Sequence, residues 1–119
     1  MIHDRKYTRD HVWMDEAGCV GLSAYLLASA GRVVKLHLPE LGATLATATC
    51  FGALEVDKGV LDLFAPCAGP VLERNERALT DPASIGPDTW LIRTDGESAA
   101  RMSELEYETY AGTTPITPR

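Results

Sequence analysis

Two β-prone runs separated by a short polar turn dominate residues 45–66. The runs are LATATCFGALEV and GVLDLFAP, both rich in apolar, β-branched and aromatic residues, and they meet at the tripeptide Asp57–Gly59. Such a pattern predicts a β-hairpin. We expect a three-residue loop, formed by a type I turn followed by Gly59 in the left-handed conformation, with Val56 paired to Val60.

Both faces of this predicted hairpin are mostly apolar. Glu55 and Asp62 are the exceptions within its strands. A strand that is apolar on both sides is typical of a sheet with little solvent on either face. The hairpin therefore indicates a small β-sandwich rather than an open, solvated sheet.

Short elements separated by turns are predicted for the rest of the chain. Ser23 is the expected N-cap and Gly31 the expected stop of a helix over residues 23–30. A second helix is expected over residues 97–110, where apolar residues recur between acidic ones. Residues 75–88 are polar and rich in turn formers. The other expected strands are two within residues 6–22 around an acidic turn, one over 32–38, a short one after a glycine turn within 67–75 and one over 89–93.

Many short strands at regular spacing predict a mainly β fold with small helices, a compact sandwich or flattened barrel. The 119 residues, 45% of them apolar, suffice for one domain with a real core. We expect residues 1–112 to form this domain and residues 113–119 to be a disordered tail. No stretch approaches 18 apolar residues, and the start of the chain lacks the apolar segment of a secretory signal. A cytoplasmic monomer that contacts no membrane is therefore expected.

The charge argues against nucleic acid as a partner. The chain has 17 acidic and 11 basic residues and a net charge of −6, whereas phosphate binding needs a basic face. The three cysteines, Cys19, Cys50 and Cys67, have no metal-site spacing, so they are interpreted as small hydrophobic residues of a reduced compartment.

An active site of the chain's own is poorly supported. His3, His11 and His37 lie in no recognisable nucleophile motif, and glycine-rich phosphate loops are absent from the sequence. Neither a catalytic residue nor a metal ligand is therefore predicted, and the chain is not expected to be an enzyme.

Lys58 has two interpretations. It is an ordinary solvated turn residue, since Asp-Lys-Gly is common turn chemistry. Alternatively, it is a covalent attachment point, because a tight turn holds its ε-amine away from the body of the protein. Gly59 would keep the space beside that amine open.

Several segments, in order along residues 7–110, resemble the H protein of the glycine cleavage system. They are YTRDHVW, VGLSAYLLASAGRVVKLHLPELGATL, FGALEVDKGVLDLFAPCAG, WLIR and ELEYETY. The third resembles the family's attachment hairpin, with its pattern Glu-x-x-Lys-x-x-x-Asp-Leu-x-Ala-Pro-x-x-Gly. The resemblance implies the lipoyl/biotinyl type of flattened β barrel-sandwich.

By that resemblance, Lys58 carries lipoate in amide linkage. Glu55 and Gly69 match positions that the lipoylating enzyme recognises, and Asp57, Gly59 and Asp62 complete the hairpin geometry. The implied partners are a lipoate-protein ligase or lipoyl synthase system, glycine decarboxylase, aminomethyltransferase and dihydrolipoyl dehydrogenase. The carrier itself makes no bonds; its arm would shuttle an aminomethyl group between these enzymes.

The chain also departs from the family pattern. Val56-Asp57-Lys58-Gly59 replaces the usual Ser-Val-Lys-Ala, and the run before the last strand differs. An alternative is therefore an H-like lipoate-binding protein that carries sulfur intermediates for a heterodisulfide-reductase-like complex in bacterial sulfur oxidation. A lipoate-free β module used for binding is a more remote alternative. A biotin carrier fits less well, because neither neighbour of Lys58 is methionine.

Overall fold

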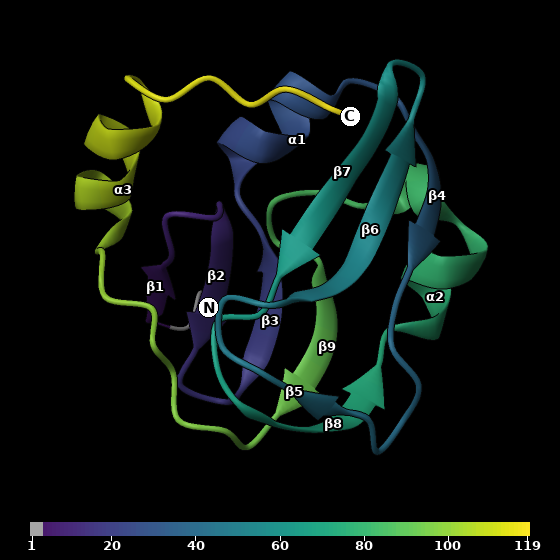
Figure 1. The fold of residues 1–119 in the computed structure, drawn as a ribbon, viewed down its shortest axis with the longest axis vertical. Helices are drawn as coiled ribbons and strands as arrows, with labels where there is room; N and C mark the ends of the chain where they lie inside the picture. The colour runs from purple at the N-terminus through teal and green to yellow at the C-terminus, as the bar shows by residue number, and fades with distance from the viewer. Residues whose placement is uncertain (1–3) are drawn as a thin grey trace.

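Two antiparallel sheets face each other in the computed structural model, which describes residues 4–119 (Figure 1). A six-stranded sheet has the order β1-β2-β3-β9-β8-β5, and a three-stranded sheet has the order β4-β6-β7. The strands are β1 Arg5–Tyr7, β2 Val12–Asp15, β3 Cys19–Leu22, β4 Val33–His37, β5 Thr44–Leu45, β6 Cys50–Val56, β7 Gly59–Phe64, β8 Gly69–Arg74 and β9 Trp90–Thr94. The helices are α1 Ala24–Ala30, α2 Glu76–Thr80 and α3 Glu104–Ala111, with a 3₁₀ turn over Pro82–Ser84.

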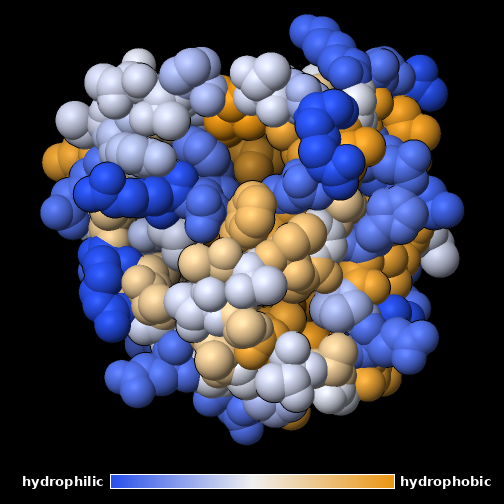
Figure 2. Space-filling model, in the orientation of Figure 1, coloured by the Kyte–Doolittle hydropathy of each residue, from blue (hydrophilic) through white to orange (hydrophobic). Residues whose placement is uncertain are grey.

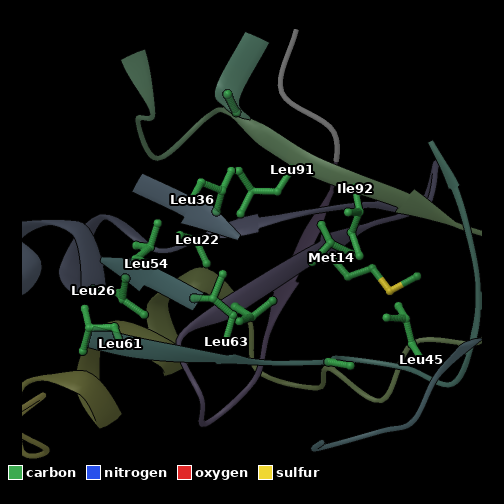
Figure 3. Packing of buried hydrophobic residues seen from close by; sticks show 14 of the residues in the cluster. Met14, Leu22, Leu26, Leu36, Leu45, Leu54, Leu61, Leu63, Leu91 and Ile92 are labelled. Carbon is green, nitrogen blue, oxygen red and sulfur yellow. The ribbon is translucent and has the colours of Figure 1, made fainter. Parts of the chain in front are cut away.

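The main core fills the space between the sheets. Leucine and isoleucine side chains from both sheets and from α1 point into it, as Figure 3 shows. Leu22, Leu54, Leu63, Leu91 and Ile92 have no exposed surface. This arrangement confirms the predicted mainly β sandwich with small helices; the two sheets stay separate and do not close into a barrel.

The first helix begins and ends where the sequence predicts. The Ser23 hydroxyl accepts a hydrogen bond from the Leu26 amide, and the Gly31 amide donates to the Leu27 carbonyl. Gly31 has a φ of 73°, which favours glycine and stops the helix.

Two predicted boundaries near the chain ends were wrong. Residues 6–22 hold parts of three strands rather than two, because His11 takes a φ of 69° and closes a turn after Tyr7 that no glycine or proline marks. The last helix begins at Glu104 instead of residue 97, since Ser98 and Met102 form isolated β-bridges with Cys67 and Tyr7. A short helix, α2, also forms within the stretch predicted to be turns.

The tail over residues 113–119 contacts other parts of the chain in this structure, while its predicted disorder stays a prediction. It has no regular secondary structure, but it runs from α3 past α1 to the hairpin of β6 and β7 (Figure 1). Ile116 packs against the main core, and the Arg119 backbone hydrogen-bonds to Val60. These contacts oppose the chain entropy that favours disorder.

Candidate functional site

The hairpin of β6 and β7 is the candidate site. One side of each strand faces the core, where Leu54, Val56, Leu61 and Leu63 are at most 6% exposed. The turn projects beyond this core at the top of Figure 1. Buried side chains on both strands thus fix the base of the turn.

The predicted register of the hairpin was wrong by one residue. Val56 pairs with Gly59, so the loop contains only Asp57 and Lys58, and Val60 pairs with Glu55. Gly59 has the predicted positive φ, at 142°, but it is the first residue of β7 and not part of the loop. A positive φ favours glycine at this position.

Lys58 lies at the tip of this two-residue turn and is exposed. Its side chain makes no hydrogen bond or ion pair with any of residues 4–119. The other two lysines, Lys6 and Lys35, are also exposed but lie within strands β1 and β4. Position at a projecting tip, and not exposure alone, therefore distinguishes the ε-amine of Lys58.

Glu55 lies on the outward side of β6, next to β4. Its carboxylate is 2.5 Å from Nε2 of His37, and its backbone is opposite Lys35. The side chains of Glu55 and His37 are about half exposed. This arrangement leaves a carboxylate and an imidazole at the surface three residues before Lys58.

Asp62 lies on the same outward side of the hairpin, on β7. Its two carboxylate oxygens each accept a hydrogen bond of 2.8 Å from the Arg119 guanidinium. These bonds lower the pKa of the Asp62 carboxyl, so it stays ionised at neutral pH. Asp62 thus has a partner that the sequence pattern did not suggest.

Gly69 lies far from the tip of the turn. It starts β8 in the six-stranded sheet, at the opposite end of the molecule in Figure 1. A Cβ at this position would be 3.0 Å from Cα of Gly96. The close approach of the two backbones gives Gly69 a packing role; its predicted part in recognition by the lipoylating enzyme stays a prediction.

Sequence reasoning missed His37 and Arg119 as neighbours of the site. The alternation of Lys35 and His37 in a predicted strand could have suggested that they share a face, but the sequence does not reveal that β4 pairs with β6. Arg119 is 57 residues away from Asp62 along the chain. No local sequence pattern predicts such a contact.

No other chemical centre competes with the hairpin within residues 4–119. This range contains no cluster of three or more His, Cys, Asp or Glu residues that could hold a metal ion. His11 is buried against Tyr107, His37 pairs with Glu55, and His3 lies outside the described residues. Among these same residues, no helix is long and apolar enough to cross a membrane.

A β-sandwich that presents a free lysine at the tip of a rigid hairpin defines the class of lipoyl-type carrier domains. Residues 5–114 match the family model described as "Glycine cleavage H-protein". The chain belongs to the glycine cleavage H-protein family. Proteins of this family carry lipoate covalently on a lysine and shuttle intermediates between partner enzymes.

Named relatives and a solved structure agree with this membership. The glycine cleavage system H protein of Koribacter versatilis is 33% identical over 115 residues, which are 91% of each chain. That of Bacteroides thetaiotaomicron is 35% identical over 107 residues, 84% of this chain and 85% of the relative. The crystal structure of the H protein from Mycobacterium marinum has a TM-score of 0.85 and 32% identity, with 94% of this chain and 99% of that chain covered.

These comparisons confirm the predicted resemblance, the lipoyl-type sandwich, the carrier function and the lipoate cofactor. None of these matches supports the sulfur-carrying alternative. The family works with the glycine cleavage enzymes and the lipoylation machinery, and its members are generally carriers without catalytic activity of their own.

Proposed function

We propose that Lys58 is the lysine that carries lipoate and that the chain is the aminomethyl carrier of a glycine cleavage system. The observation that carries this proposal is the exposed, unpaired amine of Lys58 at the tip of the hairpin. The attached dithiolane would accept an aminomethyl group as it is reduced, and would later release that group and be reoxidised. The protein's own residues hold the arm and present it.

The geometry at Lys58 fits attachment by an amide bond. The ε-ammonium loses a proton to become a nucleophile, and its nitrogen attacks the carbonyl carbon of an activated lipoyl ester. The new carbon–nitrogen bond replaces the ester's carbon–oxygen bond, the activating group departs, and the nitrogen loses a second proton. The amine has no ion pair of its own to break before this attack.

The other residues of the hairpin position the lipoyl arm and take no part in a reaction. Buried residues on β6 and β7 keep the base rigid, while Glu55 and Asp57 place negative charge beside the tip. We propose that Glu55, Asp57, Gly59 and Asp62 shape the surface that the lipoylating enzyme contacts. The chain is proposed to have no catalytic site of its own and to be a substrate of its partners.

The proposed partners follow from the family and the charge. They are a lipoate-protein ligase or lipoyl synthase system, glycine decarboxylase, aminomethyltransferase and dihydrolipoyl dehydrogenase. A net charge of −6 favours partners with a basic surface around their active-site entrance.

Lipoylation followed by intact-mass measurement tests the attachment site. With lipoate, ATP and a lipoate-protein ligase, the wild-type protein should gain one lipoyl group. Lys58→Arg should gain none, whereas Lys35→Arg and Lys6→Arg should be modified like the wild type. Modification of the Lys58→Arg variant, or an unmodified wild type beside a control substrate that is modified, would contradict the proposal.

The cargo is tested separately with the lipoylated protein. It should support glycine–bicarbonate exchange by glycine decarboxylase, and the unlipoylated protein should not. Fully lipoylated protein that gives no exchange with an active decarboxylase would rule out the aminomethyl cargo while leaving the attachment site intact.

A further inference from the structure

The tail over residues 113–119 makes contacts at three separate places on its way to the hairpin. The Tyr25 hydroxyl of α1 donates a 3.0 Å hydrogen bond to the carbonyl of Thr114. Ile116 then packs against the main core. Arg119 ends the described path beside β7, as Figure 1 shows. The segment therefore follows a defined route across the surface.

The outer edge of β7 is where this route ends. In the three-stranded sheet, β7 pairs with β6 alone, so its other edge offers backbone groups that no strand of the sheet occupies. The Val60 amide donates to the Arg119 carbonyl, and the Arg119 amide donates to the Val60 carbonyl, both at 2.8 Å. This reciprocal pair is the hydrogen-bonding pattern of strand addition.

The side chain of Arg119 adds a second anchor at the same edge. Its guanidinium binds both carboxylate oxygens of Asp62, the fork-to-fork geometry that favours arginine over lysine. Asp62 and Val60 are both on β7, so backbone pairing and charge pairing act on the same short stretch of strand. The edge thus recognises an extended segment that bears an arginine.

Gly59 lets this segment come close to the turn. A Cβ on Gly59 would lie 2.2 Å from the Arg119 carbonyl oxygen and 3.4 Å from Cβ of Pro118. Residues 118–119 therefore occupy the space directly beside the residue that follows Lys58. Any enzyme that approaches the lysine from the side of β7 would meet them.

We infer that the outer edge of β7, together with Asp62, is a binding surface for an extended, arginine-bearing segment, and that residues 115–119 occupy it and limit access to Lys58. The inference rests on the proposed function of Lys58. Residues 115–119 must detach, or be displaced by the lipoylating enzyme, before that enzyme can bind the hairpin from the side of β7. The Arg119 side chain is 68% exposed. Such an ion pair is weak and is screened by salt, so residues 115–119 bind the edge of β7 reversibly.

Initial rates of lipoylation test the inference. Arg119→Ala should be lipoylated about two- to fivefold faster than the wild type, as the loss of an exposed ion pair would allow. Removal of residues 115–119 should have at least the same effect, and the final extent of modification should be equal in all proteins. Arg77→Ala is the matched control, since it removes the same charge from an exposed position on α2. It should leave the rate unchanged.

Salt provides an internal check. Because the Arg119–Asp62 pair is screened as ionic strength rises, the wild-type rate should approach that of Arg119→Ala. Any effect of salt on the ligase itself cancels in the ratio of the two rates. Rates for Arg119→Ala that equal or fall below the wild-type rate at low salt would overturn the inference.

Hydrogen exchange at the Val60 amide separates this inference from the proposed function. The Val60 amide donates a hydrogen bond to the Arg119 carbonyl. In Arg119→Ala, this amide proton should therefore exchange with solvent faster than in the wild type, whether or not Lys58 is modified. Equal protection in both proteins would show that the segment does not bind the edge and would overturn the inference alone. Failure of every protein to be lipoylated, beside an active control substrate, would overturn the proposed function and this inference with it.

Discussion

Ala48 has a backbone conformation that disfavours any residue with a side chain. Its φ is 60°, in the exposed loop that joins β5 to β6. Its amide nevertheless donates a 2.9 Å hydrogen bond to the Ala65 carbonyl, which fixes the loop against the end of β7. The left-handed conformation costs an alanine roughly 1–2 kcal/mol, so the loop holds strain that glycine would relieve.

Ala48→Gly should therefore stabilise the protein. Relief of the strain exceeds the entropy that glycine adds to the unfolded chain, so the free energy of unfolding should rise by about 0.5–1 kcal/mol. Urea denaturation measures the change. Ala46→Gly is the matched control, because this exposed residue of the same loop lacks a positive φ and should lose stability. A lower stability for Ala48→Gly would show that the loop carries no such strain.

The residues at the site differ in how far the sequence predicted them. Lys58 was predictable because its neighbours along the chain create the turn that exposes it. Arg119 was not, because its contact with Asp62 depends on the path of the tail and not on any local pattern. The positive φ of Ala48 was not predicted either, because a positive φ is normally inferred from a glycine.

At the scale of elements, α3 depends on its first turn. The Ser103 hydroxyl accepts a 3.2 Å bond from the Glu106 amide, and the Glu106 carboxylate accepts a 2.9 Å bond from the Ser103 amide. The second bond lowers the pKa of Glu106. This capping box places Tyr107 so that its ring stacks on Tyr7 of β1, with centroids 4.7 Å apart.

Ser103→Ala should lower the free energy of unfolding by about 1 kcal/mol, the usual cost of losing an N-cap. Thermal unfolding monitored by circular dichroism measures the loss. Ser103→Asp is the control, because an aspartate also caps a helix and suits its positive end. If the alanine and aspartate variants melt at the same temperature as the wild type, the cap does not hold α3 in place.

The elements themselves show which signals in the sequence were sufficient. The helix at Ser23 was predicted with both ends correct, because a cap and a glycine stop mark them. The capping box at Ser103 was also present in the sequence, yet the helix was extended back to residue 97 on apolar spacing alone. The predicted register of the hairpin was wrong for a different reason, because a glycine at a φ of 142° can begin a strand as well as close a loop.

Across the whole molecule, a chain of buried polar groups joins the residue before β2, the N-cap of α1 and helix α3. The Tyr107 hydroxyl is 2.6 Å from both Nδ1 of His11 and the Ser23 hydroxyl oxygen. Ser23 also accepts a hydrogen bond from the Leu26 amide. The Tyr107 hydroxyl has a single proton, so it donates to one of its two neighbours and accepts a hydrogen bond from the other. Burial raises the pKa of Tyr107 to about 12, so this hydroxyl keeps its proton.

Protonation of His11 would place a positive charge in this buried site, where His11 is 8% exposed. Three tyrosine rings, Tyr25, Tyr107 and Tyr110, surround the imidazole, and Asp10 is the charged residue that partly offsets its burial. Burial lowers the pKa of His11 below its usual 6.5.

Stability should therefore fall as the solution becomes acidic. Below about pH 6.5 the unfolded chain binds a proton at His11 that the folded protein resists, so the free energy of unfolding decreases until the pH passes the folded pKa. Each unit of pKa lowering contributes about 1.4 kcal/mol to this loss. Urea denaturation should show that the free energy of unfolding decreases more between pH 7.5 and pH 5 for the wild type than for His11→Asn. Asparagine tolerates the positive φ at this position but does not titrate. His37→Asn, at an exposed position, serves as the matched variant and should retain the larger decrease. If His11→Asn lost as much stability as the wild type between these pH values, the buried chain would not be the source of the acid sensitivity.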